Sequence, residues 1–302
     1  MQLNLIHSLK TSSNHDIHVF RDDLYPFLGG GNKGRKIDSI SKDIVAQGST
    51  AIVTTGGINS NHCRVTAIYA AQNNMKCTLV LHGEESTFYR QQGNSQIMRD
   101  TGANLVFVKD PSEISSKMNL AMQFYADANE MPYYLWGGGH STVGAKAYID
   151  AVSELADYRD KTNWAPKYIF LASGTGSTQA GVMAGLDKYN FYDTTVIGIS
   201  IARDRESAEK IISEFYEKVC LQYDIEPQQK TIVIDDYLCG GYEQYNAGIF
   251  ALSQSSLQQF GFILDTTYTA KAFYGMQNHL TSNISSSPIL FWHTGGLLNY
   301  LK

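Results

Sequence analysis

The chain has 302 residues, of which 43 % are hydrophobic and 18 % are charged, so it is long enough for two domains with substantial cores. Its net charge of −5 comes without a run of like charge, which argues against a nucleic-acid partner because phosphate backbones need a clustered basic surface. No apolar stretch has the length of a membrane span, and residues 1–16 lack the apolar core and cleavage site of a signal peptide. The four cysteines form neither a CxxC pair nor a zinc-type cluster with histidine, so we expect reduced thiols, no metal site, no membrane partner and a cytoplasmic location.

Short apolar segments alternate with longer amphipathic segments along the chain. The short segments are rich in β-branched residues and end in glycine or polar residues, which is typical of buried strands. Strands are expected at residues 51–57, 77–83, 104–110, 168–174, 195–201 and 288–296. Helices are expected at residues 34–48, 60–74, 112–130, 143–158 and 207–224. This alternation predicts an α/β fold with mostly parallel sheets.

The spread of these strand–helix units along the chain predicts two sheets, and therefore two domains. Glycine-rich or polar segments near 37–45 and 138–146 mark the expected boundaries. We expect a smaller domain at residues 40–142 and a larger domain formed by residues 1–39 and 143–302. Ligands of open α/β sheets bind at the carboxyl ends of the strands, so functional side chains are expected directly after the strands.

The first glycine-rich segment reads GGGNKGRK at residues 29–36. Glycine lets the main chain approach a ligand closely, so a lysine beside it has more than one interpretation. Lys33 holds a phosphate, forms an imine with a carbonyl group, or faces water as most lysines do. Arg35 and Lys36 are expected to be solvent-exposed cations at the start of a helix.

A second glycine-rich segment, SGTGSTQAG at residues 173–181, follows an expected strand and precedes a helix-like segment. It would place backbone N–H groups and the hydroxyls of Ser177 and Thr178 at a helix N-terminus, which favours an anion such as phosphate. The segment is neither a Walker A loop nor GxGxxG, and an ordinary strand–helix turn is the alternative interpretation.

A third segment, TTGGINSNH at residues 54–62, also follows an expected strand and opens a helix. Ser60, Asn61 and His62 would suit recognition of a small polar ligand, although serine and asparagine are also favoured helix caps. A fourth, HTGG at residues 293–296, follows the last expected strand.

These segments together combine a phosphate cradle, a lysine beside glycines and polar loops, without metal ligands. A phosphorylated cofactor that is bound through a lysine fits this combination. The sequence therefore predicts pyridoxal phosphate, whose ring acts as an electron sink.

The same segments resemble those of the 1-aminocyclopropane-1-carboxylate deaminase and D-cysteine desulfhydrase family of pyridoxal-phosphate enzymes. GGGNKGRK resembles the family's GGNKxRK, SGTGST its phosphate loop, and TTGGINSNHCR its TxGGxQSNH, with Asn59 in place of glutamine. LDTTYTAKAFYGM resembles DPVYxGKxxxG, and FWHTGG resembles the C-terminal HTGG. The matches run in order from about Phe20 to Gly296. The resemblance implies a two-domain, three-layer α/β/α fold of the tryptophan-synthase-β type (fold type II), a larger domain that binds the cofactor, and a homodimer.

By motif position, the resemblance implies that Lys33 binds the cofactor through an imine and later moves the α-proton of a small amino-acid substrate. Asn61 would contact the pyridoxal 3-oxygen, Ser60 would face the substrate carboxylate or the reacting centre, and His62 would add to substrate binding. The tyrosines that would lie near the substrate are Tyr268 and, in GGYEQYN, Tyr242. The phosphate would be held by Gly174, Thr175, Gly176, Ser177 and Thr178, and the pyridine nitrogen would be faced by Thr269.

Thr269 bears on the choice of reaction within that family. Ring-opening members carry glutamate after the matching tyrosine, and its carboxylate keeps the ring nitrogen protonated, whereas desulfhydrase-like members carry threonine. A neutral hydroxyl gives a weaker electron sink, which suffices when a β-substituent departs. The resemblance therefore implies α,β-elimination that yields a 2-oxo acid and ammonia, in preference to opening of a cyclopropane ring.

The sequence departs from the family pattern at residues 138–144, which read GGHSTVG where GGSNxxG is usual. His140 is a substrate ligand, a catalytic acid or an ordinary loop histidine. A 1-aminocyclopropane-1-carboxylate deaminase, an amino-acid racemase and a β-replacement enzyme are open alternatives. A rival of a different class is a non-catalytic small-molecule or nucleotide binder with Arg203 and Arg205 on a phosphate, which leaves GGGNKGRK and HTGG unexplained. Another is a family member that binds the cofactor but catalyses no lyase reaction.

Overall fold

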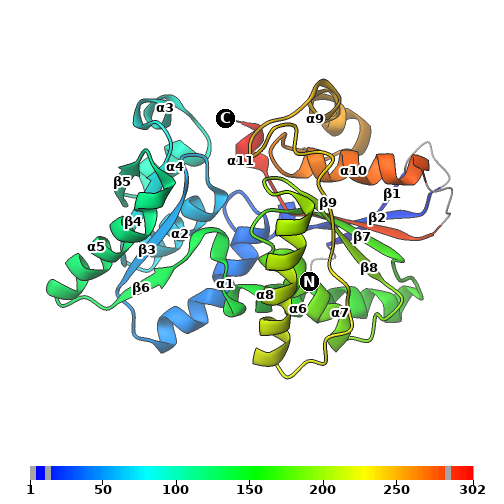
Figure 1. Cartoon of the computed structure of the whole chain (residues 1–302), viewed down its shortest axis with the longest axis horizontal. Coiled ribbons are helices and arrows are strands. Elements are labelled where there is room, and N and C mark those ends of the chain that lie inside the picture. Colours follow the sequence, from blue (N-terminus) through cyan, green and yellow to red (C-terminus); the bar gives the residue numbers. More distant parts are fainter. Residues whose placement is uncertain (1–4, 11–14, 283–286, 302) are drawn as a thin grey trace. The chain divides into compact units, whose positions relative to one another are not determined.

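The structure is a computed structural model that describes residues 5–10, 15–282 and 287–301. The chain divides into two compact units (Figure 1). The first unit contains the described residues up to Asn32 together with Ala145–Tyr300, and the second contains Lys33–Gly144. The sequence had suggested breaks after residues 39 and 142, but helix α1 (Asn32–Ala46) runs unbroken through the first of these positions.

The first unit is built on a sheet of strand order β1-β2-β10-β7-β8-β9. Strand β1 is antiparallel to β2, and the remaining neighbours are parallel. Its strands are β1 (Ile6–Leu9), β2 (Ile17–Arg21), β7 (Tyr168–Ser173), β8 (Thr195–Ser200), β9 (Ile232–Ile234) and β10 (Ile289–His293).

Helices cover both faces of this sheet because successive residues of its strands point to opposite sides. Ile169 and Leu171 of β7 pack into one core with α6, α7 and α8, whereas Phe170 and Ala172 pack into a second core with α9 and α10 (Figure 1). The helices of this unit are η1 (Asp22–Leu24), α6 (Thr142–Thr162), α7 (Ser177–Lys188), α8 (Arg205–Gln222), α9 (Ala247–Phe260), α10 (Thr269–Ser282) and α11 (Leu297–Tyr300), of which α6 begins in the second unit.

The second unit holds a parallel sheet of strand order β5-β4-β3-β6. Helix α5 packs on the face that carries Ala51, Val53 and Val80, and α2 also packs against β3 and β4 (Figure 1). The strands are β3 (Ala51–Gly57), β4 (Lys76–His82), β5 (Asn104–Val108) and β6 (Pro132–Leu135). Besides α1, the helices are α2 (Asn61–Gln72), α3 (Glu85–Arg90), α4 (Asn94–Asp100), η2 (Pro111–Glu113), α5 (Ile114–Asp127) and η3 (Gly137–Gly139).

The six strands and five helices expected from the sequence are confirmed within a few residues at their ends. The mostly parallel α/β fold is confirmed as well. Strands β1, β2, β6 and β9 were not expected, because each has only three to five residues and shows no clear pattern. Of the helices in the described residues, none is long and apolar enough to cross a membrane.

Parallel pairing brings the turns after several strands to one edge of each sheet. In the first unit, His293 lies opposite Arg21, and Ser173 lies opposite Ser200, so β2, β10, β7 and β8 end together. In the second unit, Thr54 of β3 lies opposite Leu135 at the end of β6. The segments singled out in the sequence follow these strand ends.

Candidate functional site

The three glycines at 29–31 include one, Gly31, that permits the close passage of two backbone segments. All three have positive φ angles, of 79°, 54° and 88°. A Cβ on Gly31 would lie 3.1 Å from the carbonyl oxygen of Thr294, and a Cβ on Gly295 would lie 2.6 Å from the Cα of Gly31. The N–H of Asn32 donates to the Thr294 carbonyl at 2.9 Å. Side chains at these positions would separate the two segments, which explains why glycine is required here.

Lys33 follows in the first turn of α1 and belongs to the second unit. Its Nζ donates to the carbonyl oxygen of Gly138 at 3.0 Å. The side chain is partly buried, and this burial lowers the pKa of its ammonium to about 8. At pH 7 roughly a tenth of Lys33 is therefore the neutral, nucleophilic amine, whereas an exposed lysine is almost entirely protonated.

Arg35 and Lys36 were expected to face solvent, and this expectation is wrong. Arg35 is 7 % exposed and Lys36 is 2 % exposed, because α1 packs this side of its first turns into the protein. Burial, followed by the nearby charge of Lys33, lowers the pKa of Lys36 well below the usual value for lysine.

His62 lies beside these two lysines. Its Nε2 is 2.8 Å from the hydroxyl of Thr54, and that hydroxyl donates its own proton to the carbonyl of Leu135 at 2.7 Å. Nε2 must therefore carry the hydrogen, which leaves Nδ1 as an acceptor. Burial, with the charges of Lys33 and Lys36, lowers the pKa of His62 well below its ordinary value, so the ring is neutral.

The turn at residues 54–62 is closed by its own side chains. Ser60 is the N-cap of α2, and its hydroxyl accepts the N–H of Cys63 at 3.2 Å. The side-chain oxygen of Asn61 accepts from the amide of Asn94 at 2.9 Å. The capping interpretation of Ser60 is thus confirmed, while the hydroxyl proton is left for a further acceptor.

The turn at residues 173–178 leads into its helix without a side-chain cap like that of Ser60. Gly176, the N-cap of α7, has a left-handed conformation with φ of 86°, and no side-chain hydrogen bond caps the helix in the described structure. The hydroxyl of Thr178 accepts from the side-chain amide of Asn32 at 3.2 Å. Ser173 has a buried hydroxyl without a hydrogen-bond partner among the described residues. Open N–H groups at a helix N-terminus, next to a buried unpaired hydroxyl, suit an anionic ligand.

The two arginines that a nucleotide binder would use are engaged elsewhere. Arg203 donates to the carbonyl of Gly174, so it supports the 173–178 turn from the side. Arg205 is exposed and lies 3.9 Å from the carboxylate of Asp235.

Asp265 organises the segment that carries Tyr268 and Thr269. Its fully buried carboxylate accepts the N–H groups of Thr267, Tyr268 and Thr269 at 3.0 to 3.1 Å. The hydroxyl of Thr269 donates to the same carboxylate at 2.9 Å and accepts the N–H of Asp265 at 2.9 Å. A bond from this hydroxyl to a pyridine nitrogen would require it to turn away from Asp265, so the predicted role of Thr269 stays a prediction.

Tyr242 and Tyr268, here called the tyrosine pair, contact each other through their hydroxyls. The pKa of Tyr268 is raised well above its ordinary value, chiefly by burial and then by Tyr242. Tyr268 is therefore protonated at neutral pH and can donate a hydrogen bond or a proton. Sequence similarity had suggested both tyrosines separately, and the structure brings them together.

The segment that departs from the family pattern follows β6. Gly138 and Gly139 have φ angles of 74° and 66°, which present the Gly138 carbonyl to Lys33. The hydroxyl of Ser141 accepts the N–H of Gly144 at 3.0 Å, so Ser141 caps the start of α6. His140 follows directly after these glycines, and its role in substrate binding stays a prediction.

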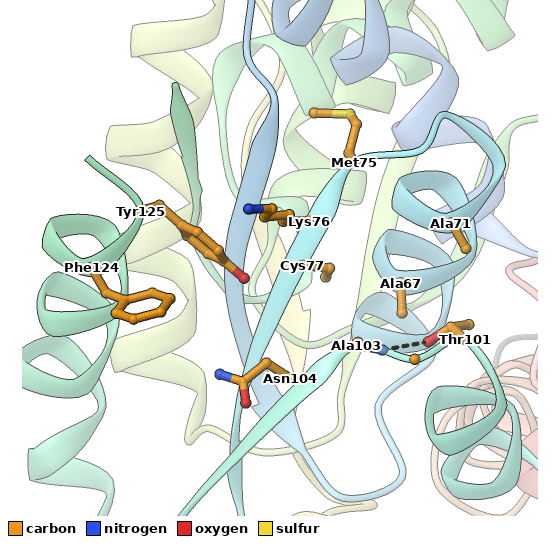
Figure 2. A pocket seen from close by; sticks show the side chains of 11 residues that line it. Ala67, Ala71, Met75, Lys76, Cys77, Thr101, Ala103, Asn104, Phe124 and Tyr125 are labelled. Atoms are coloured by element: carbon orange, nitrogen blue, oxygen red, sulfur yellow. Dashed lines mark hydrogen bonds between the residues drawn. The ribbon is translucent and has the colours of Figure 1, made fainter. Parts of the chain in front are cut away.

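A cavity of about 390 Å³ in the second unit is a separate feature (Figure 2). It lies at the amino-terminal ends of β4 and β5, beside Lys76 and Asn104, whereas Lys33 and His62 lie near the carboxyl ends of β3 and β6. Ligands of parallel sheets bind at the carboxyl ends. The cavity is therefore not the site that the sequence segments predict.

The structure adds residues that the sequence analysis did not single out. Asn32 supports Thr178, Asp265 holds the turn before α10, and Lys271 of α10 is fully buried. Asn32 and Asp265 lie inside or beside the quoted motifs, so their position alone was a usable signal. Lys271 also lies inside a quoted motif, at the lysine of DPVYxGKxxxG, but its burial has no distinguishing mark in one sequence.

Known proteins with similar sequences cover nearly the whole chain. A D-cysteine desulfhydrase from Serratia proteamaculans is 29 % identical over 289 residues, which are 93 % of this chain and 86 % of that protein. A Pyrococcus abyssi protein, named provisionally as a 1-aminocyclopropane-1-carboxylate deaminase, is 31 % identical over 93 % of this chain and 84 % of its own.

Solved structures with a similar fold also cover nearly the whole chain. The crystal structure of an ACC deaminase homologue has a TM-score of 0.89 at 27 % identity, covering 98 % of this chain and 90 % of the other. A fungal L-serine ammonia-lyase from Rhizomucor miehei shares the fold at a TM-score of 0.65 and 14 % identity, covering 93 % of this chain and 89 % of the other. The expected fold class is confirmed.

The family model described as "Pyridoxal-phosphate dependent enzyme" matches residues 2–295. The cofactor predicted from the glycine-rich segments is thereby confirmed, and the nucleotide-binder alternative is wrong. This chain belongs to the family of pyridoxal-phosphate-dependent enzymes.

Proposed function

We propose that the protein is a lyase that removes the α-proton and a β-substituent from a small amino acid, in the manner of a D-cysteine desulfhydrase, and so forms a 2-oxo acid and ammonia. The observation that carries this proposal is Lys33, whose amine has a pKa of about 8 and donates to the Gly138 carbonyl. The names of the relatives support the reaction class, since they include a D-cysteine desulfhydrase.

The side chains present suit pyridoxal phosphate. In this proposal Lys33 would hold the aldehyde group, Asn61 would contact the 3-oxygen, and the 173–178 turn with the open N-terminus of α7 would hold the phosphate. The hydroxyl of Ser173, unpaired among the described residues, is one donor that this turn still has to offer. Bound pyridoxal phosphate supplies an electron-withdrawing ring that stabilises negative charge at the α-carbon.

Lys33, once freed from the cofactor, would take the α-proton of the substrate. With a pKa of about 8, roughly a tenth of Lys33 is already the free base at pH 7, compared with less than about a thousandth of an ordinary lysine. The Gly138 carbonyl is an acceptor for the displaced Lys33 amine. The neutral ring of His62 adds no competing positive charge beside it.

The tyrosine pair handles the leaving group. Tyr268 keeps its proton at neutral pH because its pKa is raised, and it can give this proton to a departing thiolate. The α C–H and β C–X bonds break, the leaving group departs as HX, and the aminoacrylate that is released takes up water to give the 2-oxo acid and ammonia.

Elimination is favoured over ring opening by the absence of a carboxylate at position 269. Thr269 is neutral, and the nearest carboxylate in sequence, on Asp265, already accepts three backbone N–H groups and the Thr269 hydroxyl. A ring nitrogen without a carboxylate partner gives a weaker electron sink, which suffices when a good leaving group departs.

A substrate panel tests the proposal. Purified protein loaded with pyridoxal phosphate is assayed for 2-oxo acid and ammonia with D- and L-cysteine, serine, β-chloroalanine and 1-aminocyclopropane-1-carboxylate. We expect release from amino acids with a β-leaving group. Release from the cyclopropane substrate alone would refute elimination.

Lys33→Ala and Lys42→Ala provide the matched pair of variants, because both lysines belong to α1 and Lys42 is exposed. We expect Lys33→Ala to lose the visible absorbance of the lysine-linked cofactor and all turnover. Lys42→Ala should keep both. A wild-type protein that acquires no such absorbance with pyridoxal phosphate would contradict the assignment of Lys33.

The protein is further proposed to act as a homodimer in the cytoplasm. The dimer rests on the family resemblance, and the location on free thiols, since Cys63, Cys77, Cys220 and Cys239 are all unbridged. Light scattering should give a mass about twice that of the 33.5 kDa chain. A mass of one chain would contradict the dimer.

A further inference from the structure

Lys271 is a buried lysine that the proposed mechanism does not use. It lies in the first turn of α10 and is 0 % exposed. Its ammonium donates to the carbonyl oxygens of Leu238 at 2.9 Å and Gly241 at 3.1 Å. A buried cation is costly unless it is paired and hydrogen-bonded, so these two carbonyls are a substantial part of what keeps Lys271 in place.

The segment that receives these bonds, residues 238–242, is here called the 238–242 turn. Its backbone is unusual, because Cys239, Gly240 and Gly241 have φ angles of 55°, 98° and 135°. Positive φ at a residue other than glycine is uncommon and unfavourable, so the conformation needs support from outside the turn. The turn's own bond from the Gly241 N–H to the Leu238 carbonyl, at 3.0 Å, leaves that carbonyl able to accept Lys271 as well.

The turn ends at Tyr242, whose hydroxyl contacts that of Tyr268. Tyr268 directly precedes α10 and lies three residues before Lys271 in sequence. Residues three apart along a helix project from the same side. The start of α10 thus supplies both the tyrosine that Tyr242 meets and the lysine that holds the backbone beneath Tyr242.

Tyr237, the residue before the turn, also packs against α10. A Cβ on Gly275 would lie 3.0 Å from the ring of Tyr237, and the rings of Tyr237 and Tyr274 are 5.8 Å apart, edge to face. These contacts fix the chain just before the turn. The two bonds from Lys271 fix the turn itself, up to the residue before Tyr242.

We propose that Lys271 is a positioning residue that fixes the 238–242 turn, so that the hydroxyl of Tyr242 stays in contact with Tyr268. Lys271 acts through Tyr242 and does not touch the substrate. This inference rests on the proposed function, in which the tyrosine pair serves the leaving group.

A double-mutant cycle measures whether Lys271 acts through Tyr242. Lys271→Met keeps the length of the side chain and removes its donors, and Tyr242→Phe removes the hydroxyl. We expect Lys271→Met to lower kcat/KM about tenfold in the wild-type background, mainly through kcat. In the Tyr242→Phe background the same change should lower it less than about twofold, because the interaction that it supports is already absent. Equal losses in both backgrounds would overturn the proposal.

Hydrogen exchange gives a readout that needs neither cofactor nor substrate. Amides of the 238–242 turn should exchange at least about tenfold faster in Lys271→Met than in the wild type. Their exchange rates in Tyr242→Phe should equal those of the wild type. Unchanged exchange in Lys271→Met would also overturn the proposal. If that variant folds poorly, Lys271→Gln, which keeps one donating group, replaces it in both measurements with the same expected direction.

Lys210→Met serves as the control, because Lys210 is an exposed lysine of α8. It should change neither kcat/KM nor exchange in the turn. All variants should keep the visible absorbance of the cofactor bound through Lys33. If the effects of Lys271→Met and Tyr242→Phe are independent while that absorbance is intact, only the role of Lys271 is refuted. A wild type without the absorbance would refute the proposed function.

Discussion

The turns at 54–62 and 173–178 look alike in sequence but differ in how their helices begin. Each follows a parallel strand, contains glycine and hydroxyl residues, and opens a helix. At α2 the hydroxyl of Ser60 caps the helix by accepting the Cys63 N–H. At α7 the cap position is Gly176, which has no side chain to offer.

This difference separates a structural helix start from a ligand site. At a capped N-terminus some of the free N–H groups already have a hydrogen-bond acceptor. At an uncapped N-terminus these groups, together with the favourable helix dipole, remain available for an anion. We therefore expect the phosphate at the uncapped start of α7 and not at the capped start of α2. Four predictions test this division.

The largest effect is expected at Gly176. Gly176→Ala would bring its Cβ against the side chain of Ile212 and strain a backbone with φ of 86°. Because the open end of α7 would shift, we expect affinity for pyridoxal phosphate to fall about a hundredfold. Equilibrium dialysis measures this affinity.

Gly261→Ala is the matched control, since Gly261 also lies at a helix terminus, with φ of 74°, but has open space where its Cβ would be. Equal losses of affinity in the two variants would remove the special role of α7.

The pH dependence of cofactor attachment should follow Lys33. Its pKa is lowered to about 8, so the neutral amine increases as pH rises and levels off above that value. We expect the rate of attachment to unloaded protein to rise about fiftyfold from pH 6 to pH 8, as the neutral fraction does. Stopped-flow absorbance measures this rate. A rate that keeps rising tenfold per pH unit up to pH 10 would mean an ordinary lysine.

Ser177→Ala should affect the cofactor more than the fold. The hydroxyl of Ser177 lies 3.2 Å from that of Thr175 and does not cap α7. We expect affinity for pyridoxal phosphate to fall about tenfold, and the free energy of unfolding of the unloaded protein to change by less than about 0.5 kcal/mol. Binding and urea titrations on the same preparation measure both. Unchanged affinity would exclude this hydroxyl from the phosphate site.

Ser60→Ala should give the opposite pattern and the smallest effect. Loss of the cap on α2 is expected to cost about 1 kcal/mol of unfolding free energy. Affinity for the phosphate group, measured with pyridoxal phosphate, should change less than about threefold. A hundredfold loss of affinity here would place the phosphate at α2 and reverse the comparison.

Much of the fold was predictable because its central strands are short apolar segments bounded by glycine. Such segments as residues 168–174 are distinctive, whereas β9 (Ile232–Ile234) is too short to show a pattern. The motif segments were expected to follow strand ends, and this placement is confirmed. Their role in binding stays a prediction, which rests on the rule that ligands bind at the carboxyl ends of parallel strands.

The burial of charged side chains was not predictable. Lys33, Lys36 and Lys271 look alike in sequence, yet one donates to Gly138, another is packed within α1, and the third holds the 238–242 turn. Whether a lysine is buried depends on acceptors that are distant in the chain. The link between Thr269 and Asp265 was missed for a related reason, since side-chain bonds at a helix start depend on rotamers that a motif does not specify.

The central claim is that Lys33, among these buried lysines, binds the cofactor. Borohydride reduction of the loaded protein makes the lysine–cofactor bond permanent, and peptide mass mapping then locates it. We predict a single label on Lys33 that is absent in Lys33→Ala. A label on Lys36 or Lys271 would contradict the account.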